Sequence, residues 1–537
     1  MEKRAFIAVV LSLLVLLGYQ EWIARYYSVP APPPSPVKQE PEKAAPPAPP
    51  VSAQVASPPV KLPVRQGARE IRVETDNYVA LFTNQGARLK SFKFKHYRGA
   101  VNESSPPFEI VSSAAGVPFP LGVQWQGAAP PNDDQDLLYG VEGNDLKLTG
   151  DSKGTLVFHG QAPNGYSITK SLTFTGSTYP IGLELSVKAT DGSAPVPELL
   201  LTEKSDQTVL NPDAHFEGVI ALVDNKISRE KPPEATKKGE DLTGEISWAG
   251  FGYTYFFFGL LPQDPAPQKV SVHSNGPALI AAMSSPAAKP QGAGHYTLFI
   301  GPKELDILKS LGKGLERSID FGYFSFISIP LLYMLHFSHR FTGSYGIDII
   351  LLTVLIKLLM APLTHKSYVS MKQMQKLQPQ MERLKEKFAD DKEKLNKEIM
   401  ELYRRNGVNP LGGCLPMVLQ FPVFIGLYNA LSTPIELRHA SFLWIKDLSR
   451  PDWQSLPFTI GDWHLGIPIL TILMGASMFL QQWMTPSAGD PNQRKMMMLM
   501  PLMFTFMFVS FPAGLTVYWL VNNILSIGQQ YWINRRV

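Results

Sequence analysis

The chain has 537 residues, of which 45% are hydrophobic and 18% are charged, and it contains 47 prolines and one cysteine. This length exceeds what one core of ordinary size can hold, so several domains are expected. The net charge of +4 is too small to favour nucleic-acid binding, and a single cysteine excludes an intramolecular disulfide.

The first 27 residues have the pattern of a membrane signal anchor. Basic residues at positions 3 and 4 precede Ala5–Ile23, which is apolar apart from Ser12, Gln20 and Glu21. A cleaved secretory signal starts in the same way, but no cleavage site of the Ala-x-Ala kind follows directly here. We therefore predict an uncleaved signal-anchor span over residues 1–27, with the cleaved signal as the alternative.

A proline-rich stretch follows the anchor. Residues 30–63 contain 13 of the 47 prolines, together with Ala, Glu, Lys and Gln. Such a composition cannot bury a core and is typical of an extended, semi-rigid tether. We predict a linker over residues 28–66.

Short alternating apolar runs, separated by Gly, Asn, Asp and Pro, fill residues 67–305. This is the pattern of a large all-β sandwich or barrel-like domain. The run Tyr253–Leu261 is too short to span a bilayer and is predicted to be a buried strand. The clearest alternating runs are Tyr78–Phe82, Leu89–Phe94, Thr155–Phe158, Ser167–Phe174 and Ile181–Val187.

An amphipathic segment, residues 319–341, precedes the next apolar span. Its many Phe and Leu side chains are followed by His336, His339 and Arg340, so we predict a helix lying along the outer membrane interface. The two histidines are spaced i, i+3 and could place two metal ligands on one face. Because no third ligand is evident, we prefer an interfacial polar face and predict no metal site.

Five further apolar segments form the C-terminal part, and the charges of their loops orient them. Residues 366–405 hold 11 Lys and Arg, whereas the loop 433–465 holds only three. The positive-inside rule then places the basic loop and both termini in the cytoplasm, with the β domain and the 433–465 loop outside. We predict a multi-domain membrane protein with six spans, five of them in a core over residues 342–535. These five segments are 346–364, 411–432, 466–484, 496–511 and 513–533.

The basic loop, residues 367–406, has helical periodicity. Two apolar series with 4-3 spacing flank Ala389–Asp391, which predicts a cytoplasmic hairpin of two amphipathic helices. The series either hold a self-contained coiled-coil hairpin together or form a docking arm for a ribosome or targeting factor. The series are Leu377, Met381, Leu384 and Phe388, then Leu395, Ile399 and Leu402.

Polar side chains inside the spans are the candidate functional residues. Lys357 lies in the apolar stretch Ile347–Ala361, where a charge costs about 2.5–3.5 kcal/mol and normally faces a wet cavity, a partner or a transported group. Thr353 lies one helical turn away on the same face. The alternatives are snorkelling of Lys357 to the interface and interhelical hydrogen bonding of the amides. The other candidates are Gln420, Tyr518, Trp519 and Asn522.

Enzyme motifs give no support to catalysis. The sequence lacks a Walker-type phosphate loop, an HExxH motif and Cys/His zinc spacing, so we predict no catalytic residue and no cofactor. Gly150–Gly154 (GDSKG) matches the string of a nucleophile elbow. Strand-like runs lie on both sides of it, however, and these favour a β-turn.

Several ordered motifs in residues 340–533 resemble the YidC membrane protein insertase family. The N-terminal anchor, the Pro-rich tether and the large β domain are similar to the Gram-negative form of that family. The motifs are KLLMAPLT at 357–364, LQP at 377–379, NPLGGCLP at 409–416, LWIKDL at 443–448 and FPAGL at 511–515.

The resemblance implies a non-enzymatic insertase in the bacterial inner membrane, with its β domain in the periplasm. Such a protein accepts nascent membrane proteins in a groove and releases them sideways into the lipid bilayer, alone or beside the Sec translocon. In the family an arginine supplies the positive charge of the groove, and this chain has Lys357 at the matching position. Lysine keeps the charge but lacks the planar fork of arginine, so a mechanism that needs bidentate pairing is put in doubt.

Two rival functions compete with this interpretation. A secondary transporter or channel could use Lys357 to bind an anionic solute, but it predicts inverted repeats, and the sequence has no such symmetry. A carbohydrate-processing β domain anchored in the membrane would need only one span and leaves the other five unexplained.

Overall fold

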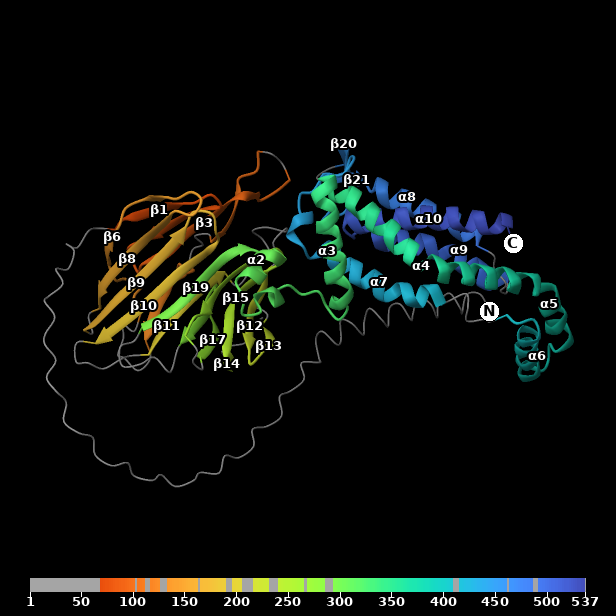
Figure 1. The fold of residues 1–537 in the computed structure, drawn as a ribbon, viewed down its shortest axis with the longest axis horizontal. Coiled ribbons are helices and arrows are strands. Elements are labelled where there is room, and N and C mark those ends of the chain that lie inside the picture. The colour runs from red at the N-terminus through yellow and green to blue at the C-terminus, as the bar shows by residue number, and fades with distance from the viewer. Residues whose placement is uncertain are drawn as a thin grey trace, which may run out of the picture. The chain divides into compact units, whose positions relative to one another are not determined.

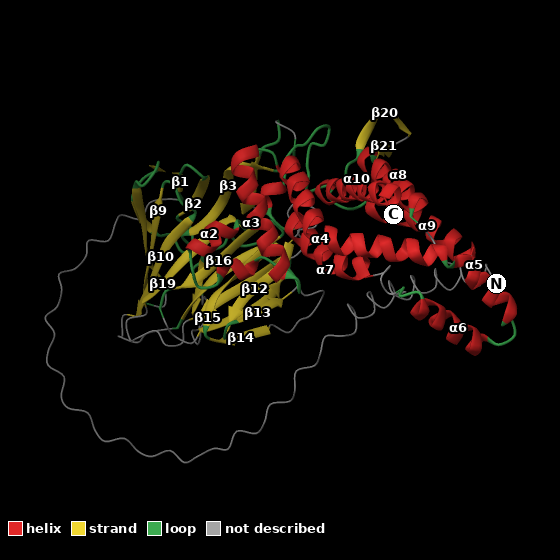
Figure 2. Ribbon diagram, turned by 45° about the vertical axis from the view of Figure 1, so that its right-hand side comes forward, coloured by secondary structure: helices red, strands yellow, loops and turns green. Residues whose placement is uncertain are grey.

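The computed structural model describes residues 68–101, 104–111, 116–125, 133–162, 165–189, 196–204, 216–230, 240–264, 268–284, 293–408, 415–460, 463–485 and 491–536. The predicted signal anchor and Pro-rich linker lie outside these residues. Strands make up the first part of the described chain and helices the second (Figure 1, Figure 2).

Three sheets account for the β region, and nearly all of their strand pairs are antiparallel. The first has the order β4-β3-β2-β1-β7, with β1 (Glu70–Glu74), β2 (Tyr78–Thr83), β3 (Arg88–Arg98), β4 (Pro107–Val111) and β7 (Leu146–Lys147). The second has the order β13-β12-β15-β16-β19-β10-β9-β8-β6, with β6 (Gly140–Glu142), β8 (Lys153–Gln161), β9 (Tyr166–Thr175), β10 (Pro180–Ala189), β12 (Phe216–Val223), β13 (Lys226–Glu230), β15 (Ile246–Tyr253), β16 (Phe256–Pro262) and β19 (Ala293–Pro302). The third has the order β14-β17-β18-β11-β5, with β5 (Gly122–Trp125), β11 (Pro197–Lys204), β14 (Glu240–Gly244), β17 (Gln268–Asn275) and β18 (Ala278–Ser284).

The run Tyr253–Leu261 corrects one prediction. It is buried, but it is not a single strand, because β15 ends at Tyr253 and β16 begins at Phe256. The two strands pair antiparallel, with Gly252 opposite Phe257. Periodicity missed this hairpin because both strands are buried on both faces and carry no polar alternation. At Gly150–Gly154, by contrast, a turn does precede β8, with Ser152 N donating to Thr149 O at 3.1 Å.

A charged cluster interrupts the apolar core of the β region. Strand β9 turns Ile168, Leu172 and Phe174 inward, and Lys170 occupies the same inward row at 1% exposure. The ammonium of Lys170 donates to Asp134 Oδ2 at 2.6 Å and to two backbone carbonyl oxygens. Burial lowers the pKa of Lys170 to about 8, although the nearby Asp134 carboxylate opposes this shift.

Asp134 is the centre of this cluster. Its second oxygen, Oδ1, accepts hydrogen bonds from Val123 N at 2.9 Å and from Arg88 Nη2 at 3.2 Å. Tyr139 OH also donates to Oδ2, at 2.8 Å. One buried carboxylate therefore joins β3, β5 and β9 to the loop that precedes β6.

The helical part begins with two short helices and continues with long ones. The structure places α3 later than the predicted interfacial helix, and α4 runs twelve residues past the predicted end of its span, so the predicted hairpin begins inside α4. A β-hairpin, not predicted, lies in the loop 433–465. The elements are α2 (Leu305–Ser310), η1 (Leu315–Ser318), α3 (Ser325–Thr342), α4 (Tyr345–Lys376), α5 (Gln378–Lys387), α6 (Lys392–Arg405), α7 (Leu415–Ser432), η3 (Ile435–Leu437), β20 (Gln454–Ile460), β21 (Trp463–Ile467), α8 (Ile469–Met484), α9 (Pro491–Phe508) and α10 (Ala513–Arg536).

Among the described helices, α4 alone has both the length and the hydropathy of a membrane span, with 32 residues. The segments Ile469–Met484 and Met497–Phe508 are apolar but shorter. Helix α10 packs against α4 and α8, and α3 packs against α4 and α7 (Figure 1). At Gly475 a Cβ would lie only 2.1 Å from Thr505 Oγ1, so the close approach of α8 and α9 requires glycine there.

A buried carboxylate fixes the turn between α3 and α4. Asp348 has no exposed surface, yet it lies in the first turn of an apolar helix. Thr342 Oγ1 donates to it at 2.6 Å, and His339 Nδ1 lies 2.8 Å from its other oxygen. The His339 ring also stacks on Tyr345, with centroids 3.7 Å apart. These contacts account for one of the two histidines that were weighed as metal ligands.

The other histidine, His336, forms an ion pair that joins α3 to η3. His336 Nε2 lies 3.2 Å from Glu436 Oε1, and both side chains are largely buried. Burial lowers the pKa of His336, but the nearby carboxylate of Glu436 outweighs this and raises the pKa above its ordinary value of 6.5.

The raised pKa of His336 predicts a pH-dependent contact. Because the folded pKa exceeds the unfolded value of 6.5, stabilisation by the pair is fully present below about pH 6.5 and is lost as the pH rises through the folded pKa. We expect His336→Gln to cost up to about 1 kcal/mol at low pH and little at high pH. Amide exchange of Ile435–Leu437, corrected for intrinsic rates, measures this. His295→Gln, at an exposed position on β19, is the control. A loss that is equal at both pH values would contradict the prediction.

Candidate functional site

The cation of Lys357 lies between α4 and α10. Its Nζ donates to Ser526 Oγ at 2.5 Å and lies 3.4 Å from Asn522 Oδ1. Ser526 Oγ in turn donates to its own helix, at Asn522 O. None of the ion pairs among the described residues involves Lys357, so its charge is solvated by neutral oxygens alone.

A polar seam continues from Lys357 along the two helices. Gln529 Nε2 donates to Thr364 Oγ1 at 3.0 Å and to Ala361 O at 3.3 Å. Further on, Lys372 Nζ donates to Asn534 O at 3.2 Å. Residue numbers rise together along both helices, so α4 and α10 run parallel.

The structure brings only some of the predicted residues together. Lys357 and Asn522 meet directly, and Gln420 lies close enough to Tyr518 to influence its phenol. Thr353 is 1% exposed, and its hydroxyl donates to Ile349 O, in its own helix. It shares the face of Lys357, but its hydroxyl is bonded to the backbone and not to the lysine.

Trp519 packs in an aromatic cluster. Its ring lies 5.0 Å from Phe424 of α7 and 5.1 Å from Phe508 of α9, measured between centroids. Asn523 donates to Ser477 Oγ of α8 at 3.0 Å. These two residues hold the helices together beside the polar seam.

Sequence reasoning missed Ser526, Gln529 and Thr364. The signal was available, because Asn522, Ser526 and Gln529 are spaced i, i+4 and i+7 and so share one face of α10. Thr364 follows Lys357 by seven residues and shares its face in the same way. Two matching polar stripes on two apolar helices would have predicted the seam.

Comparison with known proteins identifies the chain. Residues 337–537 match the family model described as "60Kd inner membrane protein", and residues 70–334 match the "YidC periplasmic domain". The chain belongs to the YidC membrane protein insertase family. The resemblance seen in the sequence motifs is thereby confirmed, and so is a β-rich periplasmic domain followed by a helical inner-membrane part.

Full-length YidC insertases from other bacteria support the same assignment. The membrane protein insertase YidC of Syntrophus aciditrophicus is 41% identical over 565 residues and covers 100% of both chains. That of Pelobacter propionicus is 39% identical over 558 residues, again with 100% coverage of both. A solved YidC insertase covers 88% of this chain and 95% of its own at 16% identity, but its TM-score of 0.37 is too low to bear on the fold.

The predicted docking residues of this YidC-family chain lie on α5 and α6, except Leu377 and Phe388, which flank α5, and several pack against each other. Leu377 and Met381 are buried with Tyr403 and Val408, and Ile399 and Leu402 lie against this cluster. Tyr403 OH also contacts Met381 Sδ at 2.9 Å. These residues build the core of the helix pair, as the self-contained hairpin requires.

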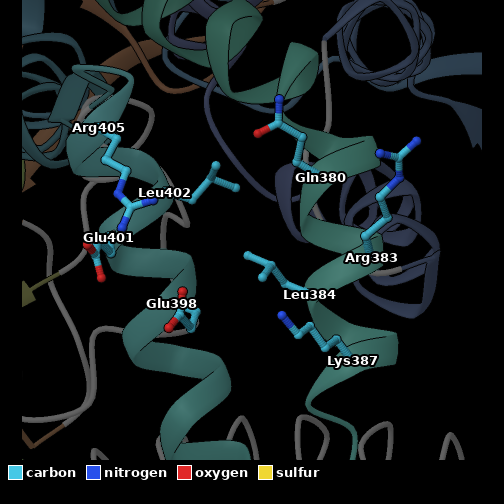
Figure 3. A pocket seen from close by; sticks show the side chains of 8 residues that line it. All are labelled: Gln380, Arg383, Leu384, Lys387, Glu398, Glu401, Leu402 and Arg405. Atoms are coloured by element: carbon cyan, nitrogen blue, oxygen red, sulfur yellow. Dashed lines mark hydrogen bonds and ion pairs between the residues drawn. The ribbon is translucent and has the colours of Figure 1, made fainter.

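A small open pocket of about 220 Å³ lies between α5 and α6. Figure 3 shows Leu384 of α5 and Leu402 of α6 pointing toward each other across it. Glu398 and Glu401 line its α6 side, and Arg383 and Lys387 its α5 side. Leu384, Phe388 and Leu395 remain partly exposed beside this charged rim.

Proposed function

We propose that this protein accepts newly made membrane proteins in a polar groove around Lys357 and releases them sideways into the lipid bilayer. Membership of the YidC insertase family supports the activity. The single observation that carries the site is a cation in an apolar helix, held by Ser526 and Asn522, with no carboxylate partner among the described residues. A charge kept in this state at a cost of about 2.5–3.5 kcal/mol needs a functional reason.

The mechanism follows from charge and burial. A client's short outer tail carries acidic residues that must cross an apolar layer, and Lys357 attracts them transiently. Neutral oxygens of Ser526 and Asn522 solvate the charge without neutralising it. The client's apolar helix then enters lipid and gains about 25 cal/mol per Å2 of apolar surface removed from water. No nucleotide and no cofactor is needed for these steps.

The proposed topology has six spans, with both termini cytoplasmic and the β domain and the 433–465 loop periplasmic. The distribution of Lys and Arg between the loops supports it. The parallel course of α4 and α10 supports it as well, because both helices would cross from the periplasm to the cytoplasm. In this arrangement α3 lies at the periplasmic interface, and the domain limits are those of the sequence prediction.

Insertion by the purified protein tests the proposal. The full-length chain is reconstituted in proteoliposomes with a single-span client that has a short acidic outer tail, and insertion is followed by protease protection. We expect protection of the tail without nucleotide or Sec translocon. If liposomes with and without the protein protect the client equally, the insertase proposal fails. Uptake of a small anion by the same liposomes would instead support the transporter.

We propose that a ribosome or targeting factor docks on residues 366–405, because this segment holds 11 Lys and Arg. Replacing residues 378–405 with a short Gly-Ser linker should remove most co-sedimentation with translating ribosomes. Insertion of an already released client should persist, since Lys357 and its partners lie outside the deletion. Unchanged co-sedimentation would contradict the docking role. We also propose contact with the Sec translocon, on the ground of the same family membership.

A further inference from the structure

A groove of about 560 Å³ lies between α3 and α4, away from the polar seam. It is lined by Pro330, Tyr333, Met334 and Phe337 of α3 and by Leu351 and Leu355 of α4. Its volume falls within the range of about 300–1,000 Å³ that is usual for small-molecule sites. Large apolar side chains are open to the surroundings here, with Phe337 64% and Leu351 47% exposed.

The groove offers almost no hydrogen-bonding group to a ligand. Ser338 supplies one hydroxyl at its edge, but that hydroxyl donates to Leu335 O at 3.0 Å. An occupant of this groove therefore has to be apolar along its length.

The groove lies on the back of α4 with respect to the proposed client path. At about 100° per residue, Leu351 and Leu355 point roughly 120–160° away from Thr353 and Lys357. A client attracted to Lys357 is thus on the opposite side of the helix. Because the family is an inner-membrane one and α4 has the properties of a span, the back of α4 faces lipid.

A cation marks one wall of the groove. Lys309, which is exposed on α2, donates to the hydroxyl of Tyr333 and lies 4.8 Å from the centre of its ring. An ammonium has three donors, so two remain for another acceptor. An apolar groove with a lysine and a tyrosine at its edge matches an acyl chain joined to a phosphate.

We infer that the α3–α4 groove binds one acyl chain of an anionic phospholipid, whose phosphate is held by Lys309. The bound lipid fills the space between α3 and α4. It thereby stabilises the angle between these two helices, which the contacts of Asp348 also fix. The site is separate from the client groove, and its occupant is part of the bilayer rather than a client.

Photolabelling of the full-length protein in liposomes tests this site. The probe is phosphatidylglycerol with a diazirine in one acyl chain, and the labelled peptides are mapped by mass spectrometry. We expect labelling concentrated on residues 330–337 and 351–355. Leu355→Trp, which fills the groove, should abolish it, whereas Leu502→Trp, at a position of α9 that is 69% exposed, should leave it unchanged.

The headgroup and the occupant are tested separately. Lys309→Gln should lower the preference for phosphatidylglycerol over phosphatidylcholine about fivefold, the contribution of one lysine near a membrane surface, while Lys226→Gln should not. Met334→Ala enlarges the groove and should keep the labelling. It therefore shows that a loss of labelling in Leu355→Trp comes from filling the groove and not from misfolding of a variant with a changed groove residue. Even labelling over α8 and α9, or capture of a client helix by a photoreactive residue at position 334, would overturn the inference. Neither result would alter the outcome expected for Lys357.

Discussion

Lys357→Leu should abolish insertion of a client with an acidic outer tail, and Lys357→Arg should retain it. Two unit charges about 4 Å apart near a protein surface interact by about 4 kcal/mol. Losing even half of this in the crossing step slows it roughly 30-fold. Leucine keeps the helix and removes the charge, whereas arginine keeps the charge on a side chain of similar reach. Protease protection in proteoliposomes, followed over time, measures the rates.

Two controls make this result specific. Lys372→Leu removes another cation of the same helix, one that donates to Asn534 O further along the seam, and it should insert the client at nearly the native rate. A client whose acidic residues are changed to amides should lose its dependence on Lys357. If Lys357→Leu inserts the acidic client as fast as the native protein, Lys357 is a snorkelling residue and the proposed mechanism is wrong.

Retention by arginine carries further information about the site. Ser526 Oγ and Asn522 Oδ1 contact Nζ of Lys357 as single acceptors, not as a planar pair. A site that needs only positive potential should work equally well with lysine or arginine at position 357. Faster insertion by Lys357→Arg would instead point to bidentate pairing of the arginine with the client. Ser526→Ala is expected to slow insertion less than Lys357→Leu does, because it removes one solvating oxygen and leaves the charge.

The family and the type of most elements could be predicted from the sequence, since they rest on local patterns. The β runs, the amphipathic segment and the polar residue in α4 are all local features. Helix ends were less predictable: α4 continues to Lys376 because Lys366 and Lys372 are good helix formers, and a loss of apolar character does not end a helix. Hydropathy therefore gave the end of the apolar segment and not the end of the helix.

Partners across the chain were the part that the sequence could not supply. Nothing local connects Lys357 with Ser526, which is 169 residues away, or Lys170 with Asp134 in another element. Strand alternation in the predicted run puts Lys170 on the same face as Ile168, Leu172 and Phe174. The sequence does not show, however, that the carboxylate of Asp134 meets it there.

Asp134→Asn should be the most damaging single change in the β region, with a loss of about 3–5 kcal/mol in the free energy of unfolding. The carboxylate has no exposed surface, and it neutralises Lys170 and Arg88, which are 1% and 4% exposed. An amide leaves two buried cations without a counter-charge. It also has to turn an NH₂ group toward donors, because each oxygen of Asp134 accepts two hydrogen bonds.

Denaturant unfolding of the full-length protein, followed by the fluorescence of buried Trp125 and Trp248, measures this loss. Glu70→Gln is the matched control, since it breaks the exposed ion pair with Lys90 and should cost less than about 1 kcal/mol. Adding Lys170→Met to Asp134→Asn should recover part of the stability, because one orphaned charge is removed. If Asp134→Asn is as mild as the control, the cluster is not a stabilising centre. If the double variant is less stable than the single one, the cost lies in lost packing and not in the unpaired charge.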